Sequence, residues 1–88
     1  MMLLGNIISG AFDKQMNEFS LQQIKHFTTE TIIHEQQLNN LYNYLKKHAD
    51  DTDGHILTLY DQMPIRLSQE EIQLLLHDLE KVQSMYGE

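Results

Sequence analysis

The chain has 88 residues, with 13 Asp and Glu against six Lys and Arg, which gives a formal net charge of −7. This length allows a single domain over residues 1–88. Nucleic-acid binding depends on basic side chains that neutralise phosphates, so the acidic balance argues against DNA or RNA as a direct partner. It favours another protein that presents a basic surface.

The sequence contains no Cys, so it offers neither a disulfide nor a thiol nucleophile. Its apolar start, MMLLGNIISGAF, is too short to span a bilayer and lacks the positive charge that begins a signal peptide. These features predict a cytoplasmic protein with no membrane partner.

Apolar side chains recur at helical spacing over Met1–Phe19. They include Leu4, Ile8, Phe12 and Met16. The spacing predicts a first helix, although Gly5 and Gly10 would each lower helix stability by roughly 1 kcal/mol. This segment either covers the next helix, runs on into it, or forms an arm that docks on another subunit or partner.

Ser20–His48 contains no Pro and no Gly, and it predicts one long polar helix. Ser20 and Gln23 fit a capping box at its start. A 3-4 spacing places Ile24, Phe27, Thr31, His34, Leu38, Leu41 and Leu45 on one stripe. Such a helix would span roughly 43 Å, whereas a compact chain of this size is about 31 Å across. The mismatch predicts an elongated hairpin, or a helix end that packs on another chain.

The acidic turn ADDTDG follows the predicted long helix. It lacks the first Asp and the final bidentate acid of an EF-hand loop, so we expect no calcium site. The next stretch, Gly54–Met63, fits a short helix by its apolar spacing, and we predict a helix there. A strand paired with Ile65–Leu67 is the alternative, although an isolated hairpin of this size would be marginal.

Ser68–Tyr86 has the clearest helix signals in the chain. Ser68 and Glu71 fit a capping box. A single apolar face contains Ile72, Leu75, Leu76, Leu79 and Val82. We expect this helix to pack antiparallel to the C-terminal part of the long helix.

No group of residues predicts catalysis. His26, Glu30 and His34 are spaced four apart and would share one face of a helix. The two His residues would then lie roughly 12 Å apart along the axis, which is too far for one ion. We therefore expect no catalytic residue, no metal ligand and no cofactor, and we predict that the protein is not an enzyme.

The sequence thus predicts an all-α fold of three or four helices, arranged as an elongated hairpin or bundle. The predicted function is protein–protein interaction, by a small acidic regulator, inhibitor or adaptor of bacterial or phage origin that covers a partner's surface. The candidate partner-binding residues are Leu4, Ile8, Phe12, Ile24, Phe27 and Ile32. A homodimer or higher oligomer is expected. The alternatives are a self-associating structural subunit and a transcriptional regulator linked to DNA.

Overall fold

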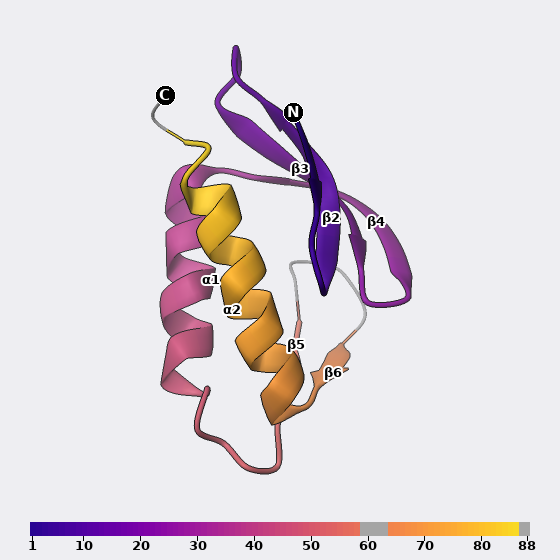
Figure 1. Ribbon diagram of the computed structural model, residues 1–88, viewed down its shortest axis with the longest axis vertical. Coiled ribbons are helices and arrows are strands. Elements are labelled where there is room, and N and C mark those ends of the chain that lie inside the picture. Colours follow the sequence, from indigo (N-terminus) through magenta and orange to yellow (C-terminus); the bar gives the residue numbers. More distant parts are fainter. Residues whose placement is uncertain (59–63, 87–88) are drawn as a thin grey trace.

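The computed structural model describes residues 1–58 and 64–86. Its elements are β1 (Met2–Leu4), β2 (Ile8–Asp13), β3 (Glu18–Ile24), β4 (Phe27–Ile33), α1 (Glu35–Lys47), β5 (His55–Leu57), β6 (Ile65–Leu67) and α2 (Gln69–Gln83). A four-stranded antiparallel sheet in the order β1–β2–β3–β4 is joined by a two-stranded sheet of β5 and β6. Both helices lie on the same side of the larger sheet (Figure 1). The predicted all-α fold, with its elongated helical hairpin, is therefore wrong.

The first half of the predicted long helix is a β-hairpin. β3 and β4 are joined by a two-residue turn at Lys25 and His26, and Lys25 has a positive φ of 54°. The composition of β4, FTTETII, explains the error, because its Thr and Ile residues are β-branched and fit a pleated strand better than a helix. Phe19, Leu21 and Ile24 point into the core, whereas Ser20, Gln22 and Gln23 do not.

The predicted helix or arm over Met1–Phe19 is also wrong, because this segment forms β1, β2 and the start of β3. Alternate residues of β2 are buried, which is the two-residue period of a strand. Gly10 permits a close approach between strands, since a Cβ at this position would lie 2.1 Å from the carbonyl oxygen of Ser20. The register of β2 against β3 shifts beside this residue, between Ser9 and Gly10.

The second half of the predicted long helix is confirmed as α1. The backbone N–H of His34 donates to Gln37 Oε1 at 3.0 Å, which satisfies one donor at the N-terminus of the helix. Leu38 and Leu45 are fully buried. Lys46 and Lys47 lie in the last turn, where positive charge suits the helix dipole.

The helix predicted over Gly54–Met63 is wrong at its start, where β5 pairs with β6, and residues 59–63 lie outside the described part of the chain. The alternative hairpin is the one that forms. Gly54 has a φ of +77°, and a Cβ there would lie 2.3 Å from the carbonyl oxygen of Leu67. The short hairpin is stabilised from outside itself, because Leu57, Ile65 and Leu67 are buried in the common core.

α2 confirms the C-terminal helix prediction. Ser68 Oγ accepts the N–H of Glu71 at 3.1 Å, and the N–H of Ser68 donates to Glu71 Oε1 at 2.9 Å. The helix runs antiparallel to α1 (Figure 1): Gln83 near its end donates to Asn39, and Gln69 at its start donates to the carbonyl of Ala49. The predicted apolar residues of this helix are buried.

One core joins both sheets and both helices. The fold is 39 Å along its longest axis, with a radius of gyration of 12.3 Å. Breaking the predicted long helix into a hairpin and a shorter helix removes the length mismatch. The chain therefore covers its own apolar surface on the helix side of the sheet.

Candidate functional site

The side of the four-stranded sheet that faces away from the helices is the candidate site. The pairing places two rows of side chains on it: Met2–Ala11–Ser20–Ile32 and Leu4–Ser9–Gln23–Thr28. On the opposite side Leu3, Ile8, Phe12 and Phe19 are buried in the core. Because neighbouring residues of a strand point to opposite faces, the two rows lie on the surface away from the helices. We call it the outer face.

The outer face has a centre of small side chains and an apolar rim. Ser9, Ala11 and Ser20 lie along its two middle strands. At the β1 edge Leu4 is 82% exposed and Met2 is 61% exposed, and at the β4 edge Ile32 is 47% exposed. A partner that covers the face would bury these exposed apolar side chains at both of its edges.

The charged side chains of the four strands have one sign. Strands β1 to β4 carry Asp13, Glu18 and Glu30 and contain no Lys or Arg. All three acidic residues alternate with inward-facing residues, so they belong to the outer face or its ends. Glu18 lies 3.6 Å from the ring of His34 just beyond β4. The outer face therefore attracts positively charged groups.

A hollow of about 450 Å³ opens over β3 and β4. Its lining residues are Ser20, Gln22, Thr28, Thr29, Glu30 and Ile32. The register of β3 against β4 shifts between Leu21 and Gln23, and such irregularities bend a sheet locally. Hydroxyl, amide and carboxylate groups in this hollow are suited to hydrogen-bond a partner's polar side chains.

β4 forms one edge of the sheet. Among the described residues it pairs with β3 alone, so its other edge offers backbone groups for a further strand. Phe27 lies at the start of this strand and is 39% exposed. The hydroxyl of Tyr86 donates to the carbonyl oxygen of Ile33 at the far end. An edge with no second strand partner among the described residues therefore borders the outer face.

The structure divides the predicted partner-binding residues into two groups. Leu4 and Ile32 lie on the outer face, and Phe27 lies at the β4 edge. The other three point into the core, where Ile8 and Phe12 are 3% exposed and Ile24 is 2% exposed. Helical spacing put these residues on one face, whereas the strands place them on opposite faces of the sheet. The small residues of the outer face were missed, although their alternation with apolar residues is visible in the sequence.

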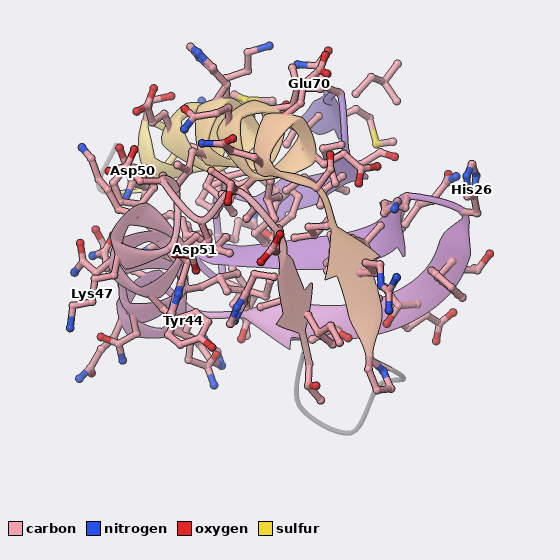
Figure 2. All side chains as sticks on the ribbon, turned by 90° about the horizontal axis from the view of Figure 1, so that it is seen from below. His26, Tyr44, Lys47, Asp50, Asp51 and Glu70 are labelled. Carbon is pink, nitrogen blue, oxygen red and sulfur yellow. The ribbon has the colours of Figure 1, made fainter. Side chains whose placement is uncertain are left out.

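The residues considered for a metal site do not come together. His26 lies at the tip of the β3–β4 turn, far from α1 (Figure 2), while Glu30 is on β4 and His34 precedes α1. Within the described ranges, a different group combines ligand types at short range: His48, Asp51 and His55. Its two His residues lie at the end of one element and the start of the next, so spacing along a single helix could not identify it.

A second hollow of about 610 Å³ lies between α1 and β5. Tyr44 and Ile56 line it and are 43% and 53% exposed. Its lining residues also include Leu57 and Thr58. All four strands of the outer face lie within the described residues.

Neither α1 nor α2 is long and apolar enough to cross a membrane. No protein-family model, no curated protein and no solved structure matches this chain.

Proposed function

We propose that this protein is a protein–protein interaction module whose outer face binds a basic surface of another protein. It acts as a regulator, inhibitor or adaptor by covering that surface, and the proposal assigns it no reaction. The observation that carries the proposal is a sheet face with exposed Met2, Leu4 and Ile32 whose charged side chains are all acidic. A cytoplasmic location is part of the proposal, because the chain has no Cys.

Two forces would act in such a complex. Burial of the exposed apolar rim contributes about 25 cal/mol for each Å² removed from water. The carboxylates, with a chain charge of −7, steer a cationic partner toward the face and select against acidic ones. Because salt screens exposed charges over about 8 Å at physiological ionic strength, binding should weaken as salt concentration rises.

Site-specific photo-crosslinking tests the location of the surface. In one variant of the chain a photoreactive amino acid replaces Thr28 on the outer face. In a second variant it replaces the exposed His77 on α2. The proteins are expressed in the native host and irradiated, and crosslinked proteins are identified by mass spectrometry. The proposal expects a partner with a basic surface to crosslink from position 28 and not from position 77.

A matched pair of variants then tests the contact with the purified partner. Ile32→Glu places a charge on the apolar rim, whereas Ile56→Glu makes the same change at a similarly exposed Ile on β5. The affinity should fall at least tenfold for the first variant and stay unchanged for the second. Loss of binding in Ile56→Glu alone would move the site to the hollow beside α1 and overturn the proposal, as would binding that is insensitive to salt.

Self-association through β4 is a second candidate function, as for a subunit of a larger assembly. The observation that favours it is that the described residues place no strand on the outer edge of β4, beside the exposed Phe27. Two copies would pair these edges and extend the sheet. Light scattering would then give a multiple of the 10.4 kDa chain mass, and Phe27→Lys would return it to the monomer value. A monomer at high concentration would rule this candidate out.

A further inference from the structure

Two imidazoles and a carboxylate meet at the C-terminal end of α1. His48 ends the helix, Asp51 lies in the following turn, and His55 is the first residue of β5. His48 Nδ1 is 2.8 Å from Asp51 Oδ2. The rings of His48 and His55 are stacked, with their centroids 4.2 Å apart and their planes at 13°. One ligand atom from each of the three residues falls within 4.8 Å of the others.

We propose that His48, Asp51 and His55 bind one divalent transition-metal ion of the zinc class. Imidazole nitrogens and carboxylate oxygens are the ligands that Zn²⁺ takes in proteins, at about 2.0–2.2 Å. Ligand atoms around such an ion are roughly 3.4 Å from one another, so ligand atoms that are now up to 4.8 Å apart must approach by about 1.4 Å at most. His48 Nδ1 and Asp51 Oδ2, which are 2.8 Å apart, already lie within this distance. Side-chain rotation supplies this movement, because His48 and Asp51 are 32% and 47% exposed and are not locked in the core.

The backbone holds the three ligands close before any ion arrives. The N–H of Asp51 donates to the carbonyl of His48 at 3.1 Å, and the N–H of Gly54 donates to the carbonyl of Asp51 at 3.1 Å. Two successive turns thus connect the first ligand with the third. The positive φ of Gly54 directs the chain into β5, which places His55 beside His48.

A neighbouring side chain orients one of the imidazoles. Tyr44 lies one helical turn before His48, and its hydroxyl is 2.5 Å from His55 Nε2. Metal-binding His rings are commonly held by such a second hydrogen bond, which fixes the ring before the ion binds. Tyr44 and Asp51 lie between α1 and β5 (Figure 2). The cluster therefore has three ligands and a supporting hydrogen bond.

The surroundings favour a cation and select its class. Asp50 and Asp53 flank Asp51 in a hollow of about 410 Å³, and they add negative charge next to the ligands. Calcium takes six to eight oxygen ligands, whereas two of the ligands here are imidazoles. Three protein ligands would leave a fourth position of a tetrahedral ion for water or for a group from another molecule.

Isothermal titration of the chelator-treated protein with ZnCl₂ tests the site. The expected result is one ion bound per chain, and at least tenfold weaker binding in His48→Ala and in Asp51→Asn. His77→Ala is the matched control, because His77 is 72% exposed on α2 next to Glu80 and lies outside the cluster. Its binding should equal that of the wild type, and CaCl₂ should give no heat above dilution.

The same titration can overturn the proposal. Absence of zinc binding would do so, and so would binding that survives both ligand variants or that falls equally in His77→Ala. Circular dichroism establishes that each variant is folded. If His48→Ala unfolds, the zinc affinity of Asp51→Asn alone decides the result. This substitution removes the charge of an exposed side chain and keeps its shape, so the turn should stay folded. The outcome is independent of the outer face, so this proposal and the proposed function can fail separately.

Discussion

The carboxylate of Asp78 on α2 accepts the backbone N–H of Ile7 at 2.6 Å, and this contact joins the helix to the loop between β1 and β2. The same carboxylate accepts the N–H of Asn6 at 2.9 Å and that of Ile8 at 3.2 Å. Asp78 is fully buried. A buried acidic group is stable when hydrogen-bond donors surround it, and here the backbone supplies them.

Replacing Asp78 with Ala should therefore destabilise the fold strongly. The change leaves three backbone donors without their acceptor, and each unsatisfied buried group costs about 1–3 kcal/mol. We expect a loss of roughly 3 kcal/mol or more in the free energy of unfolding, measured by urea denaturation. Asp50→Ala, in the exposed turn after α1, is the control and should change stability by less than about 0.5 kcal/mol. Equal effects of the two substitutions would contradict this role of Asp78.

Glu71 should make stability depend on pH. The backbone N–H of Ser68 holds the pKa of this carboxyl below its ordinary value of 4.5, and the ion pair with Lys25 acts in the same direction, while partial burial opposes both. Because the pKa is lower in the folded state, the stabilisation is present above about pH 4.5 and is lost as the pH falls through the folded-state pKa. The stability difference between wild type and Glu71→Gln should therefore shrink between about pH 5 and pH 3 in urea titrations. A constant difference would show that the ionised carboxylate is not the source.

Gly10→Ala should strain the sheet. The added methyl would meet the backbone oxygen of Ser20 at 2.1 Å, and a backbone atom cannot move aside by side-chain rotation. We expect a loss of about 1–3 kcal/mol in thermal or urea denaturation. Ser9→Ala is the matched control on the neighbouring outer-face position. The stability of Ser9→Ala should stay within about 0.5 kcal/mol of the wild type. A Gly10→Ala protein as stable as the wild type would contradict the close approach of β2 and β3 at this position.

Tyr86→Phe should test how the chain after α2 is held. The Tyr86 hydroxyl donates to the carbonyl of Ile33, and its ring packs edge-on against Phe12 with centroids 4.8 Å apart. Phe keeps the ring contact and removes the donor. The expected loss is about 1 kcal/mol, the usual net contribution of one hydrogen bond. Hydrogen exchange of the amides in β4 should rise along with it. Unchanged exchange and stability would exclude a role for this bond.

The helical parts of the fold were predictable because their signals are local. Ser68 and Glu71 identify the start of α2 within one turn, and its apolar face follows the period of a helix. Asp78 lies on that same face, four residues before Val82. A lone acid among buried Leu residues was a visible sign of a structural role, although its hydrogen-bond donors near Ile7 were not visible.

The strands were not predictable in the same way, because the same residues fitted both the spacing of a helix and the alternation of a strand. Ile24, Phe27 and Thr31 follow a helical 3-4 spacing, and the absence of Pro and Gly allowed the helix to continue. The β-branched content of Phe27–Ile33 was the competing signal, and β propensity depends on the neighbours that a strand finds. The same error placed Ile8, Phe12 and Ile24 among the candidate partner-binding residues, although their side chains fill the core.

By itself, the sequence determined the net charge of −7, the helix after Ser68 and the helical character of the stretch that became α1. Each of these depends on composition or on hydrogen bonds between residues a few positions apart. Only the tertiary structure decided that Leu4 and Ile32 share one sheet face, that Asp78 meets Ile7, and that His48 stacks on His55. The physical reason is that strand pairing and buried polar contacts join distant segments, and neither partner carries a local signal that specifies the other.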